Sequence, residues 1–179
     1  MIFDAESRNI EQIKEKKEKN QPFKKKKKME TDKTINVLNK LVEINNDRIE
    51  GYQTASSETD EPDLKALFLQ FVQISEKCKQ ELSSEIFSLG GLPTEETKLS
   101  GKVYRTWMDI KSAVTGHDRV ALLNSCEYGE EQAIGIYEKV INEEMEYLSI
   151  EQQTLIRKQY ALIESDHTRL KSILEAQEV

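Results

Sequence analysis

Four long stretches of this chain carry apolar residues at three- and four-residue spacing, the pattern of amphipathic α-helices. They cover about residues 32–57, 61–89, 118–142 and 150–176. None of them shows the two-residue alternation of a half-buried strand. The low content of 7 Gly and 3 Pro in 179 residues also favours helices. The sequence therefore predicts an all-α domain.

Residue types at the predicted helix ends support these boundaries. Pro62 falls in the first turn of the second helix, where its missing N–H does no harm. Gly90 and Gly91 follow that helix and are typical of a C-terminal stop. Ser149 and Gln152 have the three-residue spacing of a capping box at the start of the fourth helix.

The connections between the helices predict the topology. The first and last are short, whereas nearly 30 residues join the second helix to the third. Within this crossover, one face of a short extra helix is formed by Val103, Trp107, Ile110 and Val114. A four-helix bundle with one long crossover is the ferritin-like arrangement. We therefore predict a ferritin-like four-helix bundle over residues 31–177.

Residues 1–30 differ in character from the rest of the chain. Residues 1–28 contain 10 Lys and Arg against 5 Asp and Glu, a net charge of +5, whereas the remaining residues carry −12. They are poor in apolar residues and interrupted by Pro22, so we expect a disordered tail, or a leader upstream of a true start at Met29. Weak binding to an anionic surface, without specific recognition of nucleic acid, is expected from the run Lys24, Lys25, Lys26, Lys27 and Lys28.

Several functional classes have no support in the sequence. No stretch approaches the roughly 18 apolar residues of a membrane span, and no signal peptide is recognisable, so a cytoplasmic location is expected. Cys78 and Cys126 lie on or beside apolar seams, where free cysteine acts as a small hydrophobe. A phosphate-binding glycine loop, a zinc-type cysteine set and a Ser-His-Asp grouping are all missing. An enzymatic activity is therefore not the favoured expectation.

Two glutamates interrupt the apolar stripe of the third helix. At heptad spacing the stripe places Glu127 and Glu130 in core-type positions between Leu123 and Ile134. A buried carboxylate is costly unless it meets a cation, a hydrogen-bond donor, a metal or water. The other helices have polar interruptions near their midpoints too, at Asn45, Ser75, Cys78 and His167. Helices of similar length would bring these residues to one polar layer.

This layer has three interpretations. In the first, hydrogen bonds fix the helix register, and His167 or Arg48 offsets a glutamate. In the second, the layer binds iron or manganese, for which a bundle commonly supplies a Glu on two helices and Glu-x-x-His on the other two. In the third, Glu127 and Glu130 turn toward the bundle edge and meet water.

The metal interpretation has an incomplete ligand set. Glu164 and His167 form one Glu-x-x-His motif, but the second helix reads Glu76-Lys-Cys-Lys79, with lysine where histidine is needed. The candidate metal ligands are Glu50, Glu127, Glu130, Glu164 and His167.

Four segments resemble a known family. They are NNDRIEGY (45–52), LGGLP (89–93), GKVYRTWMDIKSAVTGHDR (101–119) and SCEYGEEQA (125–133). Together they resemble the bacterial ferritin-like bundle proteins grouped as domain of unknown function 2383, over about residues 31–176. The resemblance implies a ferritin-like fold in a cytoplasmic bacterial protein without an established activity or catalytic residues.

These observations lead to two functional expectations. The first is a non-enzymatic helical bundle that forms a homo-oligomer, has a structural or stress-related role and needs no cofactor. The alternative is a carboxylate-bridged di-metal protein that binds or oxidises iron or manganese.

Overall fold

The structure is a computed structural model that describes residues 3–96 and 119–177, with side chains from Lys26 onward. Its long helices are α1 (Phe3–Glu58), α2 (Pro62–Ser88), α4 (Arg119–Glu143) and α5 (Ile150–Glu175). A 3-10 turn, η2 (Met145–Tyr147), joins α4 to α5. The described residues contain no strand. The predicted all-α bundle with its short, long and short connections is confirmed.

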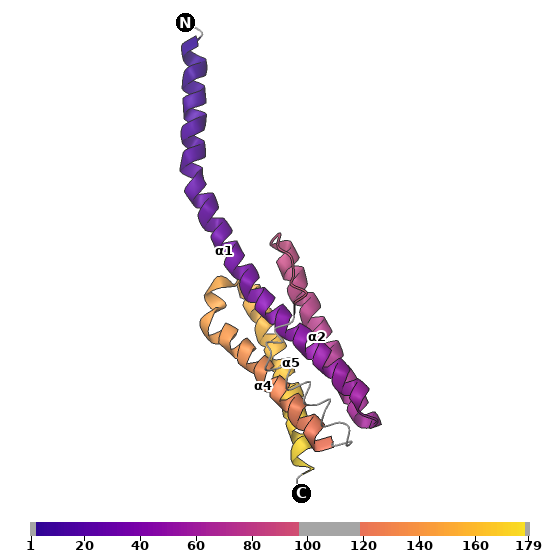
Figure 1. The fold of residues 1–179 in the computed structure, drawn as a ribbon. Coiled ribbons are helices and arrows are strands. Elements are labelled where there is room, and N and C mark those ends of the chain that lie inside the picture. Colours follow the sequence, from indigo (N-terminus) through magenta and orange to yellow (C-terminus); the bar gives the residue numbers. More distant parts are fainter. Residues whose placement is uncertain (1–2, 97–118, 178–179) are drawn as a thin grey trace.

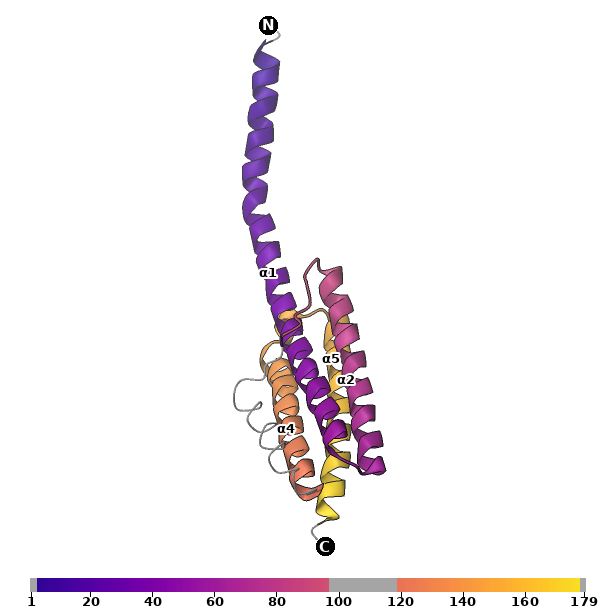
Figure 2. The same cartoon turned by 45° about the vertical axis from the view of Figure 1, so that its right-hand side comes forward.

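The four helices form an antiparallel bundle (Figures 1 and 2). Helix α1 packs against α2 and α4, and α5 packs against α4 and α2. Neighbouring helices run in opposite directions, so the middle of the packed part of α1 lies at a level similar to the midpoints of α2, α4 and α5 (Figure 2). No helix in the described ranges is both long and apolar enough to cross a membrane.

The helix ends follow the local chemistry of the sequence. The Ser149 side chain accepts a hydrogen bond from the Gln152 N–H, and the Gln152 side chain accepts one from the Ser149 N–H, so the predicted capping box is present. Helix α2 ends before Gly90, whose φ of 78° lies in the left-handed region that glycine adopts without strain.

The N-terminal region differs from the sequence expectation. Helix α1 begins at Phe3 instead of near Asp32, and residues 3–30 project beyond the bundle as a helical arm (Figures 1 and 2). A disordered tail was expected because these residues cannot form a core. They are nevertheless rich in Lys, Glu and Gln, which are good helix formers, and the packed part of α1 supplies the costly helix nucleus. Side chains from Lys26 to Glu30 are exposed, and packing begins at Thr31.

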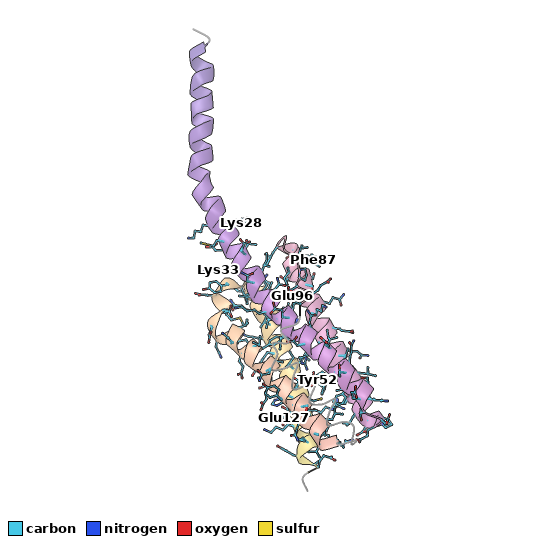
Figure 3. All side chains as sticks on the ribbon, in the orientation of Figure 1. Lys28, Lys33, Tyr52, Phe87, Glu96 and Glu127 are labelled. Atoms are coloured by element: carbon cyan, nitrogen blue, oxygen red, sulfur yellow. The ribbon has the colours of Figure 1, made fainter. Side chains whose placement is uncertain are left out.

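The crossover is described only at its beginning. There the Thr94 N–H donates to Asn39 Oδ1 at 2.9 Å, and Asn46 Nδ2 donates to the Glu96 carbonyl at 2.9 Å. These bonds hold the first part of the connection against α1, as the position of Glu96 shows (Figure 3). The predicted short helix around Trp107 lies outside the described residues.

Two apolar clusters form the core. One lies toward the end where the arm leaves and is centred on Leu38, Ile86, Tyr137 and Ile156. The other lies toward the opposite end and is centred on Phe68, Phe71, Leu123 and Leu170. Buried polar side chains occupy the level between them, and we call these the polar layer: Asn45, Arg48, Ser75, Glu130, Gln159 and Asp166.

Candidate functional site

Arg48 of α1 is the centre of the polar layer. Only 4% of the Arg48 surface is exposed, yet the guanidinium reaches three other helices. Nη1 donates to Ser75 Oγ of α2 at 3.0 Å, and Nη2 donates to Asp166 Oδ2 of α5 at 3.1 Å. Nε and Nη2 both donate to Glu130 Oε1 of α4, at 3.0 and 2.8 Å. One side chain therefore ties together all four helices.

The two oxygens of Glu130 have different surroundings. Oε1 accepts both hydrogen bonds from Arg48 and a third from the Tyr52 hydroxyl. Oε2 is buried and has no hydrogen-bond partner in the described part of the protein. A cavity of about 20 Å³ lies beside this glutamate, lined also by Asp47 and Cys126. It has room for one water-sized group.

Burial and charge together shift the pKa values of this layer. Burial alone would lower the pKa of Arg48, but the carboxylates of Glu130 and Asp166 outweigh it and raise that pKa, so the guanidinium stays charged. Burial, partly opposed by the Arg48 charge, raises the pKa of Asp166 to about 6. Burial and then the Glu130 charge raise the pKa of Tyr52, which keeps its hydroxyl a proton donor.

A second chain of hydrogen bonds lies next to the Arg48 network. Asn45 Nδ2 donates to Tyr137 Oη at 2.8 Å, and Tyr137 Oη donates to Gln159 Oε1 at 3.0 Å. Gln159 Nε2 donates to the Cys78 carbonyl at 3.2 Å and to Glu81 Oε2 at 2.9 Å. All these groups except Glu81 are buried, so this chain of hydrogen bonds connects the four helices without adding a further buried charge to the core.

The interpretation of Glu130 as a buried carboxylate offset by Arg48 is confirmed. The heptad reading of Glu127, however, is wrong. The buried seam of α4 follows Cys126, Glu130, Ala133 and Tyr137, so Glu127 lies beside it with 20% of its side chain exposed (Figure 3 marks Tyr52 on α1 and Glu127 on α4). A straight helix turns with a 3.6-residue period and drifts from a strict heptad.

On α5 the predicted seam position His167 differs in the same way. Gln159, Ile163, Asp166 and Leu170 are buried, whereas His167 is only partly buried. Asp166 and Gln159 were therefore missed as layer residues. Each directly precedes a residue that the periodicity assigned to the seam, Tyr160 and His167, and periodicity alone does not decide which of two neighbouring residues is buried.

The five candidate metal ligands do not meet at one point. Glu130 binds Arg48, whereas Glu50 and Glu164 are exposed. Only Glu127 and His167 approach each other, with 3.9 Å between Oε1 and Nε2. Among the described side chains, those of residues 26–96 and 119–177, no group of three or more His, Cys, Asp or Glu is arranged to hold a metal ion. Metal binding by this set stays a prediction.

The buried cysteines have no sign of activation. Cys78 and Cys126 are free, and at most 1% of either residue is exposed. Burial raises the pKa of Cys78 to about 11 and raises that of Cys126 further. Their thiols are therefore protonated at neutral pH and act as small packing groups.

Comparisons with known proteins agree with this architecture. Among solved structures, the chain is similar to a mutant of Mycobacterium smegmatis Dps1, with 16% identity and a TM-score of 0.65, over 82% of this chain and 97% of that chain. At this identity the likeness concerns the fold, which is the ferritin-like four-helix bundle. No curated protein matches the chain. A family model described as Domain of unknown function (DUF2383) matches residues 33–143, more than half of the sequence. The chain therefore belongs to the DUF2383 family.

Proposed function

We propose that this protein is a non-enzymatic ferritin-like bundle that associates with copies of itself and has a structural or stress-related role. The observation that carries the proposal is the position of Arg48. Its guanidinium lies between Glu130 and Asp166 at the centre of the bundle, where a carboxylate-bridged metal pair would need both carboxylates as ligands. These carboxylates are not free to bind such a metal pair, because the guanidinium of Arg48, which is always charged, already binds both of them.

Iron or manganese binding is the second candidate. One observation favours it, the approach of His167 to Glu127 at the edge between α4 and α5. Carboxylate oxygens and imidazole nitrogens are suitable ligands for both metals. Glu164 lies one turn before His167 and lines the same surface groove. A site there would be partly buried and separate from the Arg48 network.

The two candidates are distinguished by metal analysis and light scattering on protein purified without chelator. The leading proposal expects far less than one metal per chain, also after incubation with Fe(II) or Mn(II), and a mass above that of one chain. One metal per chain that is lost in Glu127→Ala and in His167→Ala, but kept in the exposed control Glu143→Ala, would favour the metal candidate. A strict monomer at high protein concentration would contradict self-association.

A further inference from the structure

Residues 3–30 of α1 form a helical arm that extends past the packed part of the bundle. It projects from the bundle in both views, and Lys28 lies where α1 leaves the bundle (Figures 1, 2 and 3). Described side chains at its base, from Lys26 to Glu30, are exposed. Its lysines are Lys14, Lys16, Lys17, Lys19, Lys24, Lys25, Lys26, Lys27 and Lys28. A basic helix of this kind gains stability from an acidic surface along which it can lie.

The bundle carries such a surface between α4 and α5. A groove of about 510 Å³ runs there, and Ile134 and Tyr160 contribute to its apolar lining. Four glutamates line it, two from each helix: Glu131, Glu138, Glu164 and Glu175. Lys171 is the one lysine among the groove residues, and no arginine lines it. We call this surface the acidic groove.

The local chemistry of the acidic groove suits lysine side chains. Tyr160 Oη donates to Glu138 Oε1 at 3.1 Å and lies 3.4 Å from Glu164 Oε1, so one hydroxyl lies between two carboxylates. Burial and the nearby Glu138 and Glu164 raise the pKa of Tyr160 to about 12, as expected where negative charge gathers. Lysine can place its methylene stem on the apolar lining and its ammonium group at a glutamate.

Length and direction identify the occupant. At 1.5 Å per residue the arm is about 42 Å long, whereas α4 and α5 are each about 38 Å long. The arm can therefore follow the full length of a bundle. It is continuous with α1 and points away from its own bundle, so it would have to break α1 to reach its own groove (Figure 1). We propose that the lysine-rich arm of one copy lies in the acidic groove of a second copy. A two-fold pair would exchange both arms and bury both grooves.

This inference rests on the self-association in the proposed function, and a charge exchange tests the surface separately. In the arm variant, Lys24, Lys25, Lys26, Lys27 and Lys28 are all replaced by Glu. In the groove variant, Glu138→Lys and Glu164→Lys are combined. The control carries Glu50→Lys and Glu76→Lys, the same change of charge at exposed residues outside the groove. Mass is measured by light scattering at low and high salt, with circular dichroism as the check of folding.

The expected result is association of wild type and control at low salt, with an apparent affinity at least about tenfold weaker at 0.5 M NaCl because of screening. Each variant alone is a monomer, and mixing the two restores a complex because the reversed arm meets the reversed groove.

If wild type associates and both variants associate equally well, or if mixing restores nothing, the inference fails while self-association stands. A monomeric wild type overturns both. If the arm variant associates as wild type does and differs only in losing retention on DNA, the partner of the arm is nucleic acid and the inference is wrong.

Discussion

At the scale of single residues, Arg48 determines whether the polar layer is stable. It is a buried cation with two carboxylate partners and a hydroxyl acceptor, each on a different helix. A buried ion pair adds little net stability compared with apolar packing, but removing one partner leaves an uncompensated charge. We therefore predict that its main contribution is to specify one alignment of the four helices.

Replacing Arg48 therefore has a large predicted effect. Arg48→Met should lower the free energy of unfolding by about 3–5 kcal/mol, because Glu130 stays buried without its cation. Lys40 supplies the control, since its 2.5 Å pair with Glu144 is partly exposed and Lys40→Met should cost less than about 1 kcal/mol. Urea denaturation measures both. The double variant Arg48→Met/Glu130→Met should recover part of the loss, and equal losses in Arg48→Met and Lys40→Met would refute the role of Arg48.

Asp166 gives the layer a pH dependence with a definite sign. Its pKa of about 6 in the folded protein lies above the value of about 3.9 in an unfolded chain. The folded state therefore binds this proton more tightly, so the Asp166 contribution to stability is fully present below about pH 4 and is lost as the pH rises through about 6. Asp166→Asn should remove this decrease. Unfolding free energies of both proteins between pH 4 and 7 measure it, and parallel profiles would exclude the shift.

At the scale of secondary-structure elements, the helices could be predicted to within a few residues except at the start of α1, whereas the faces that they bury were less well defined. Periodicity and end signals placed α2, α4 and α5 correctly. Some seam positions of α4 and α5 were predicted one residue too late, with Glu127 in place of Cys126 and His167 in place of Asp166. Packing against neighbours selects the rotation, and a polar residue next to an apolar seam can face either way.

Two glycines, Gly90 and Gly135, allow a test of how backbone conformation limits substitution by alanine. Gly90 has a φ of 78°, so Gly90→Ala should destabilise the protein by about 1–2 kcal/mol through backbone strain, although an added Cβ would meet nothing within 4 Å. Gly135 is the matched control, because it lies within helix α4 with equally open space. There alanine should stabilise by up to about 1 kcal/mol. Thermal unfolding compares the two, and changes of the same sign in both would contradict this account.

At the scale of the whole molecule, charge is separated along the chain. Residues 1–28 carry +5, and the remainder carries −12. The arm holds this positive charge outside the bundle, and the acidic groove holds part of the negative charge on α4 and α5. Opposite charges that cannot meet within one chain favour association between chains, and salt should weaken it.

The sequence by itself determined the four long helices of the described residues, the ends of α2, α4 and α5, the order of short and long connections and the need to compensate a buried glutamate. These properties depend on local spacing and on the cost of burying charge, both of which are present in one chain segment. The tertiary structure alone decided that Arg48 meets Glu130, that Asp166 and not His167 enters the layer, and that residues 3–30 continue as helix. Such outcomes depend on how helices distant in sequence rotate against one another, because only that packing decides which neighbouring side chain is removed from water.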